Sequence, residues 1–108
     1  HSAALFCNMT RCIEQNVDFV TGLLTHMRER GRARVEAAPR AEDEWTSHVH
    51  ETAARMLFTQ VDSWMTGVHS EVNHPRGRTV MVYAGGAPKF RERCDEVAAA
   101  GYAGFELR

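Results

Sequence analysis

A regular row of apolar residues near the N-terminus constrains the fold most strongly. Five of these residues recur at alternating intervals of four and three positions: Ile13, Val17, Val20, Leu24 and Met27. This spacing places them on one stripe of an α-helix, which Phe19 and Leu23 widen on its flank. Gly31 follows arginines that suit the C-terminal end of a helix. The pattern predicts a helix over about 10–30, which burial of its apolar stripe would stabilise.

Two more helices and a few extended segments are expected along the rest of the chain. Residues 34–37 alternate in a way typical of an edge strand or an extended link. Pro39 suits the start of a helix over about 40–57, whose apolar face is expected to pack on another element such as the first helix. The remaining expected elements are a buried strand at 79–83, a helix at 88–100 and an extended end at 102–107 that could add a last strand.

Residues 58–77 follow neither the helical nor the strand period. Loops of this length inside a compact domain are uncommon and usually form lids or binding loops. The segment nevertheless contains Trp64 and Met65, which solvated linkers rarely retain. Three helices with a few short strands do not close a sheet, so the pattern favours elements that complete a larger α/β body.

Composition excludes several classes of protein. The chain has 108 residues, 44% of them apolar, and a net charge of -1, which argues against disorder and against an electrostatic partner such as nucleic acid. No apolar run approaches the roughly 18 residues that span a bilayer. The three cysteines are not spaced as a paired framework, so we expect reduced thiols and a cytoplasmic location. The chain begins with His1 and lacks a signal peptide, so we expect preceding polypeptide.

Three segments, in order, carry a resemblance to a known family. The first is LFCNM at 5–9 followed by IEQNVDFV at 13–20. The second is ARMLFTQVDSWMTG at 54–67, and the third is YAGGAPKFRERCDEVAAAGYAGFEL at 83–107. Together they resemble the C-terminal part of Baeyer–Villiger monooxygenases. The Asp62-Ser63-Trp64 step and the tail from 94 to 107 are the most specific parts of the match.

The resemblance implies an architecture for the chain. The whole enzymes have an FAD domain, an NADP domain and a mobile control loop. By that resemblance, residues 1–108 would form a C-terminal segment of the FAD-binding domain in an α/β flavoprotein, with the control loop at about 58–77. The stretch after Gly67 is longer and more polar here than in familiar members, which bears on the cofactor contacts that follow Trp64.

The resemblance also implies site residues. Trp64 matches a tryptophan that helps to hold NADP. Phe6, Cys7 and Met9 match a segment that lines the substrate pocket beside the flavin, and Val82 matches another pocket-lining position. No catalytic residue and no metal ligand is assigned to this chain.

Ordinary packing is the alternative for each of these side chains. Trp64 could lie against the core of the chain, as is expected of Trp45. The proposed pocket-lining residues could be ordinary packing residues near the start of the chain. Cys94 is expected in the core because it lies on an apolar helix face. The pair His48 and His50 is not expected to share a metal, because residues two apart on a helix point to different faces. His69 and His74, five apart in the loop, do not complete a ligand set.

The parts that bind dinucleotides are missing from the chain. Dinucleotides are held by a strand, a GxGxxG turn and a helix N-terminus, and no GxGxxG occurs here. Gly85-Gly86 is interpreted as a turn. We therefore expect part of an FAD- and NADPH-dependent monooxygenase that inserts oxygen next to a ketone carbonyl, inactive alone, with both cofactors bound mainly by the remainder of the same polypeptide. The alternative is a free-standing helical binding module that uses 58–77 to hold a partner.

Overall fold

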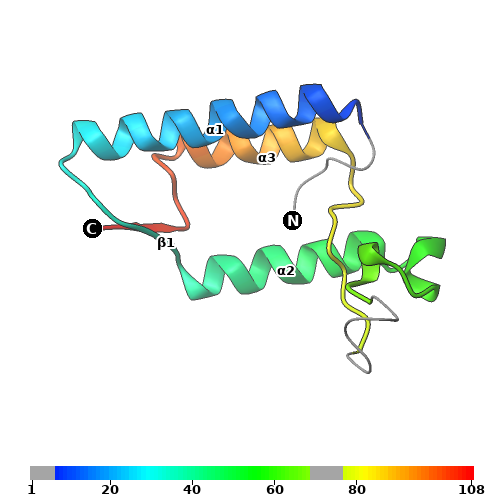
Figure 1. Cartoon of the computed structure of the whole chain (residues 1–108). Helices are drawn as coiled ribbons and strands as arrows, with labels where there is room; N and C mark the ends of the chain where they lie inside the picture. The colour runs from blue at the N-terminus through cyan, green and yellow to red at the C-terminus, as the bar shows by residue number, and fades with distance from the viewer. Residues whose placement is uncertain (1–6, 69–76) are drawn as a thin grey trace.

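The computed structural model describes residues 7–68 and 77–108, and these form two helical layers joined by extended segments (Figure 1). The elements, in order, are α1 (Met9–Glu29), β1 (Val35–Ala37), α2 (Pro39–Ala53), the 3-10 turns η2 (Leu57–Gln60) and η3 (Trp64–Thr66), α3 (Ala87–Ala99) and β2 (Phe105–Leu107). Three helices and a two-stranded sheet match the expected fold class.

Helix α1 forms where the apolar period predicts it. The side chain of Asn8 accepts a hydrogen bond from the backbone N–H of Arg11 at 3.3 Å and so caps the first turn. The helix ends before Gly31, which adopts a positive φ of 62° that favours glycine. The helix predicted over 10–30 is confirmed.

Helices α1 and α3 lie side by side and run in the same direction (Figure 1). Leu23, Met27 and Tyr102 form the buried centre of this layer. Phe19 and Val97 pack against it from the two helices. The predicted third helix is therefore confirmed, with Ala87–Ala99 as its bounds.

The segments that follow the C-terminal ends of α1 and α3 pair in a short sheet (Figure 1). β1 pairs with β2 in antiparallel register, with Val35 opposite Leu107 and Ala37 opposite Phe105. From sequence, 34–37 could be an edge strand or an extended link, and 102–107 an extended end that could add a strand; both contain strands, and Phe105 and Leu107 of β2 pack on the α1–α3 layer. The sheet therefore ties the C-terminal end of the chain to the link between α1 and α2.

Helix α2 differs from its prediction in length and in partner. It ends at Ala53, because Met56 turns extended and the chain continues as η2. Its buried face is Val49 and Ala53, and this face packs on Val80 and Tyr83. The expectation that α2 packs on the first helix is wrong, because the segment that precedes α3 occupies its apolar face (Figure 1).

Residues 79–83 were expected to form a strand, and they are extended without becoming one. Val80 and Val82 are buried while Met81 between them is exposed, as in a strand with one covered face. The N–H groups of Thr79 and Met81 donate to the carbonyls of Thr66 and Met65, both at 2.9 Å. Residues 79–83 therefore bond to the turn η3 and not to a neighbouring strand. Within 7–68 and 77–108 the sheet consists of β1 and β2 alone.

The apolar stripe of α1 remains largely uncovered. Ile13, Val17, Val20 and Leu24 are between 50% and 57% exposed, and Met27 alone of the five is buried. The helix packs on α3 through its flank, where Cys12, Gln15 and Leu23 are buried. An apolar stripe of this length is rarely left in water, so the described chain lacks the partner that the sequence pattern requires.

Candidate functional site

Trp64 stands at the start of η3 and points its indole outward, with 64% of its surface exposed. The turn that carries it ends at Gly67, whose φ of 68° needs a residue without a side chain. A Cβ at Gly67 would also approach Thr79 Cγ2 to 2.9 Å. An exposed indole on an ordered turn is a flat surface on which a planar ring can stack.

The segment 57–68, named here the Trp64 loop, is held in place at several points. The hydroxyl of Thr66, which is 1% exposed, accepts from the N–H of Ser63 at 3.1 Å and has the carbonyls of Val61 and Ser63 within 3.0 Å. The backbone bonds to Thr79 and Met81 fix the loop to the extended segment that follows. The loop backbone therefore holds the indole in its outward orientation.

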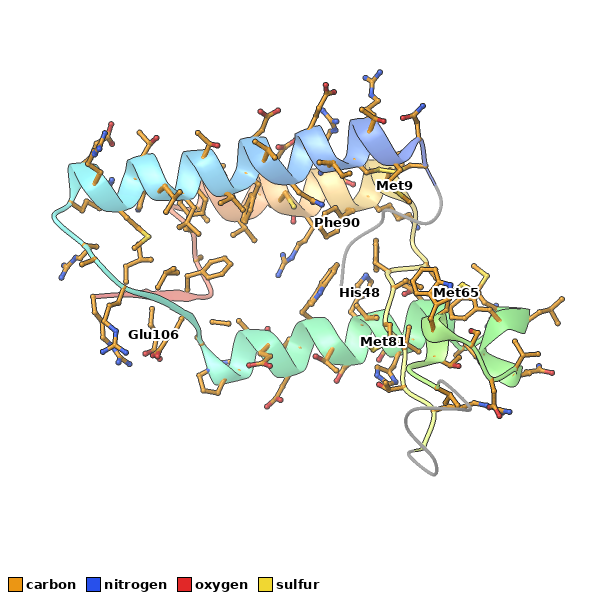
Figure 2. All side chains as sticks on the ribbon, viewed as in Figure 1. Met9, His48, Met65, Met81, Phe90 and Glu106 are labelled. Atoms are coloured by element: carbon orange, nitrogen blue, oxygen red, sulfur yellow. A yellow bond between two sulfur atoms is a disulfide. The ribbon has the colours of Figure 1, made fainter. Side chains whose placement is uncertain are left out.

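The predicted pocket-lining residues differ in their exposure. Phe6 lies outside the described residues. Met9 is 62% exposed at the start of α1, in the upper layer (Figure 2). Val82 is buried, whereas its neighbour Met81 is exposed. Met81 therefore presents the larger ligand-accessible surface of this pair, and the alternation of a half-covered extended segment was the signal that could have identified it.

Cys7 is joined to Cys12 by a disulfide, which differs from the expectation of reduced thiols. With Asn8 as the N-cap, Cys7 and Cys12 occupy the two positions that form a hydrophobic staple at the start of a helix. The link is thus a covalent form of that staple, and the spacing around Asn8 was the sequence signal for it. The segment around Met9 is fixed to the first turns of α1 by this bond.

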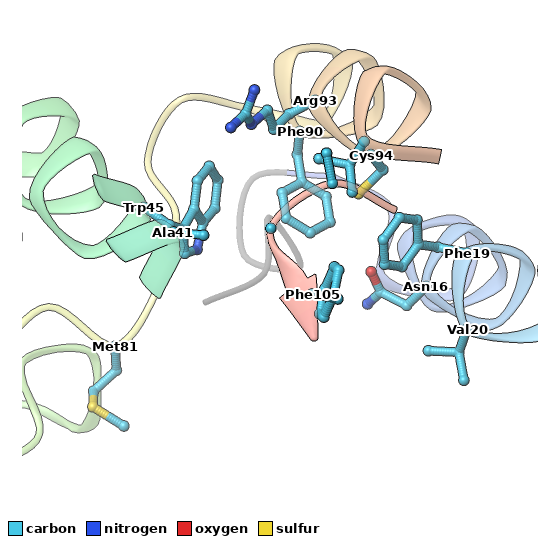
Figure 3. A pocket seen from close by; sticks show the side chains of 13 residues that line it. Asn16, Phe19, Val20, Ala41, Trp45, Met81, Phe90, Arg93, Cys94 and Phe105 are labelled. Atoms are coloured by element: carbon cyan, nitrogen blue, oxygen red, sulfur yellow. The ribbon is translucent and has the colours of Figure 1, made fainter. Parts of the chain in front are cut away.

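A cavity of about 580 Å³ lies between the two helical layers. Figure 3 shows Trp45 on one side, Phe90 and Arg93 above, and Phe105 and Val20 on the other side. Met81 also lines it, so the extended segment contributes a side chain. The lining is mainly apolar, with Arg93 as its charged member. It suits either an apolar ligand or further polypeptide.

A hydrogen-bonded aromatic group joins α2 to the extended segment. His48 Nε2 lies 3.2 Å from the hydroxyl oxygen of Tyr83, and the ring of Trp45 is 5.0 Å from that of Tyr83. Burial raises the pKa of Tyr83, because the phenolate would lose its hydration. Tyr83 therefore stays protonated near neutral pH, and the group serves to position the chain. Trp45 packs on the core as predicted.

The histidine pairs and Cys94 do not belong to a metal-binding group within the described residues. Within 7–68 and 77–108 no group of three or more His, Cys, Asp or Glu side chains is placed to hold a metal, and His69 and His74 lie outside those ranges. Cys94 is half-buried, and burial together with the charge of Asp95 raises the pKa of its thiol. No helix in the described part of the chain is long and apolar enough to span a bilayer.

Comparison with known proteins shows similarity along almost the whole chain. No protein-family profile matches. The chain is 37% identical over 107 residues to acetone monooxygenase (methyl acetate-forming) of Gordonia sp. The alignment covers 98% of this chain and 19% of that protein. It is also similar to the closed crystal structure of cyclohexanone monooxygenase, with a TM-score of 0.85 and 35% identity over 95% of this chain.

A further solved structure contains both cofactors. OTEMO in complex with FAD and NADP has a TM-score of 0.80 and 30% identity, and it covers 97% of this chain and 18% of its own. The cyclohexanone monooxygenase match covers 19% of that enzyme. The chain therefore spans about a fifth of the length of each of these relatives.

Proposed function

Because the homologues and structural neighbours of this chain are Baeyer–Villiger monooxygenases, we propose that it is a segment of an FAD- and NADPH-dependent enzyme of that type. The reaction would insert one oxygen atom next to the carbonyl of a ketone and give an ester or lactone. Acetone and cyclohexanone are the ketones in the names of two relatives. The single observation that carries the proposal is similarity over 98% of this chain to a monooxygenase about five times as long.

The exposed stripe of α1 independently supports the proposal that this chain is a segment of a longer protein. Four large apolar side chains at 50% exposure or more, on one helix, require a covering surface. In the longer polypeptide, named here the intact protein, that surface is the rest of the FAD-binding domain, and residues 1–108 are its C-terminal segment. A free-standing binding module would instead have to expose this stripe permanently.

The residues of this chain fit a role at the edge of a cofactor and substrate site. The outward indole of Trp64 offers a stacking face for NADP, and most of the Trp64 loop belongs to the proposed control loop at about 58–77. Cys7 and Met9 at the start of α1, with Phe6 and Val82, are proposed to line the substrate pocket. When bound, the flavin supplies the oxygen-transfer chemistry and NADPH the hydride. The side chains named here bind, orient and exclude water.

Further proposals concern the partner, the substrate and the cellular location of this segment. The partner of this segment is the remainder of the same polypeptide, and a small ketone is the substrate. We also propose a cytoplasmic location, where a Cys7–Cys12 bond would be exposed to reducing thiols.

The test is made on the intact protein. After purification, its absorption spectrum should show bound flavin, and NADPH oxidation should accelerate when a ketone such as cyclohexanone is added under air. The product is identified by mass spectrometry as carrying one added oxygen atom. A colourless protein, or NADPH oxidation that no ketone accelerates, would contradict the proposal.

A further inference from the structure

The Cys7–Cys12 disulfide joins a residue just before α1 to a residue in the first turns of that helix. The two cysteines are five positions apart, with the N-cap Asn8 and with Met9 between them (Figure 2). Cys12 is 6% exposed, whereas Cys7 is half-buried. We propose that this bond is a reversible thiol–disulfide site, which small-molecule thiols open and their disulfides form again.

The bond is local and does not hold separate elements of the fold together. A disulfide stabilises a protein mainly by closing a loop, and it stabilises less when the loop is short. The start of α1 is also held by hydrogen bonds to Asn8. The N–H of Cys12 donates to its carbonyl at 3.1 Å, and the N–H of Arg11 donates to its side chain at 3.3 Å. Opening the bond therefore releases Cys7 and leaves the start of α1 formed.

A cavity of about 350 Å³ gives small molecules access to the bond. Cys7 and Cys12 both line it, together with Arg11 from α1 and with Pro88 and Arg91 from α3. The cavity is partly open to solvent, and its volume is that of a small-ligand pocket. Cys7 is the more exposed of the two cysteines, so its sulfur is the one that an incoming thiol attacks.

The charges around the bond favour the exchange. The reactive species is a thiolate, and the leaving sulfur also carries negative charge as the bond breaks. The first turns of α1 and α3 contain no acidic residue, and Arg11 and Arg91 line the cavity. Cys12 lies close to the N-terminal end of α1, where the helix dipole favours negative charge. Both the approach of a thiolate and the departure of the Cys12 sulfur are therefore stabilised.

The exchange proceeds in two steps. A thiolate attacks the sulfur of Cys7, the sulfur–sulfur bond breaks, and its electron pair leaves on the sulfur of Cys12, which takes up a proton. A second thiolate attacks the small-molecule sulfur now bound to Cys7, and Cys7 is released as a thiol. Two small thiols are thereby oxidised to one disulfide while the protein bond is reduced to two cysteine thiols. The reverse sequence forms the bond again.

The exchange also has a consequence for the substrate, which rests on the proposed function, whereas the exchange itself does not. Cys7 and Met9 are proposed to line the ketone pocket, and reduction removes the covalent tie between Cys7 and α1. A less ordered pocket pays a larger entropic cost on binding, so reduction should raise KM for the ketone by about twofold or more. KM for NADPH should stay the same, because the bond has no part in the Trp64 loop.

The test equilibrates the intact protein in buffers that differ in their ratio of reduced to oxidised glutathione. Free thiols are then alkylated, and the protein is digested with trypsin, which cleaves after Arg11 and so separates the two cysteines. The oxidised protein gives two peptides linked through Cys7 and Cys12, and the reduced protein gives two separate alkylated peptides. We expect both cysteines to change together at a single midpoint. Circular dichroism should show the same fold on both sides of that midpoint.

Single variants identify the sulfur that is attacked. In Cys12→Ser, the remaining Cys7 should form a mixed disulfide with oxidised glutathione. In Cys7→Ser, Cys12 should do so at least about tenfold more slowly, because access limits the rate of exchange. Cys94→Ser removes a cysteine outside this pair and is the matched control, which should leave the midpoint unchanged. The titration of the wild type decides the question if a variant fails to fold.

Four results with the wild type would overturn the inference. The pair could stay linked in excess reduced glutathione, never link in excess oxidised glutathione, react as two independent thiols, or unfold the protein on reduction. The proposed function fails in a different way. A protein that exchanges this bond but contains no flavin contradicts the function and leaves the exchange site standing. Exchange with an unchanged KM for the ketone likewise supports the site and contradicts the pocket role of Cys7 and Met9.

Discussion

Asp62 and Arg78 form an ion pair with an Oδ1–Nε distance of 2.7 Å across 16 residues of sequence. The pair links the Trp64 loop to the start of the extended segment that follows the undescribed residues. Both side chains are about half exposed, at 62% and 47%. The pair therefore acts mainly as a positional tie, because exposed ion pairs contribute little to stability.

Breaking this tie should affect cofactor binding more than folding. Arg78→Gln is expected to change the unfolding free energy of the intact protein by less than about 1 kcal/mol. It should raise KM for NADPH, because the turn that carries Trp64 loses one of its anchors. Arg40→Gln breaks the exposed pair of Arg40 with Glu44 and serves as the matched control. A large fall in the melting temperature with an unchanged KM would show that the tie is structural only.

Removing the indole should weaken NADPH binding directly. Ring stacking on an aromatic side chain contributes about 1–3 kcal/mol, so Trp64→Ala should raise KM for NADPH by about tenfold or more and leave kcat for bound substrate nearly unchanged. Trp64→Phe should restore part of the loss. Leu57→Ala, which truncates an 81% exposed side chain in the same loop, controls for loss of apolar surface. Steady-state kinetics that rank Leu57→Ala with Trp64→Ala would argue against a stacking role.

The apolar stripe gives opposite predictions for the isolated chain and the intact protein. Burial of a valine contributes about 1.5–3 kcal/mol, and burial of an unpaired carboxylate costs more. Val17→Asp should therefore lower the melting temperature of the intact protein strongly. In the isolated 108-residue chain, the same change should reduce binding of an apolar dye, because Val17 is exposed there. Thr25→Asp, off the stripe on the same helix, is the control. If Val17→Asp leaves the melting temperature of the intact protein unchanged, the stripe is not covered there.

The helices could be predicted from sequence because their signals are local. The four-three spacing from Ile13 to Met27, and the glycines at Gly31 and Gly101, set the positions of α1 and α3 without reference to the rest of the chain. The burial of that stripe could not be predicted, because burial depends on polypeptide beyond the helix. The same distinction explains 79–83, whose composition is that of a strand and whose ladder requires a neighbour.

The site was predictable only through the family resemblance. Nothing in the residues around Trp64 indicates that the indole points outward, and packing on the core was the ordinary expectation. Val82 was chosen by match, whereas the structure exposes Met81, because alternate residues of an extended segment face opposite sides.

The thiol of Cys94 should react slowly with alkylating reagents. Burial, and secondarily the charge of Asp95, raises the pKa of Cys94, and the reactive form is the thiolate. The raised value means that the folded state favours the neutral thiol, so this contribution to stability is present below the ordinary thiol pKa and lost as pH rises through the raised one. Rates of iodoacetamide labelling, followed by mass spectrometry, should inflect at higher pH in the folded than in the denatured protein. Asp95→Asn should move the inflection part of the way back.

Gly22 allows the side chain of Tyr102 to approach α1 closely. A Cβ at this position would lie 2.5 Å from the hydroxyl oxygen of Tyr102, which is inside van der Waals contact. Tyr102 cannot retreat easily, because it is 7% exposed, has a φ of 61° and packs on Phe19 and His26. The clash of a methyl group in a packed core costs about 1–3 kcal/mol. It should outweigh the roughly 1 kcal/mol by which alanine favours a helix over glycine.

The decisive measurement is therefore a double-mutant cycle on melting temperature. Gly22→Ala alone should destabilise the intact protein. In a Tyr102→Phe background the hydroxyl is gone and the next ring atom lies 3.8 Å from the added Cβ, an ordinary contact. There the same substitution should be stabilising, since only the helix propensity remains. A change of sign between the two backgrounds would place the whole cost of Gly22→Ala on one oxygen atom, whereas equal destabilisation in both would mean that the backbone of α1, and not Tyr102, requires glycine.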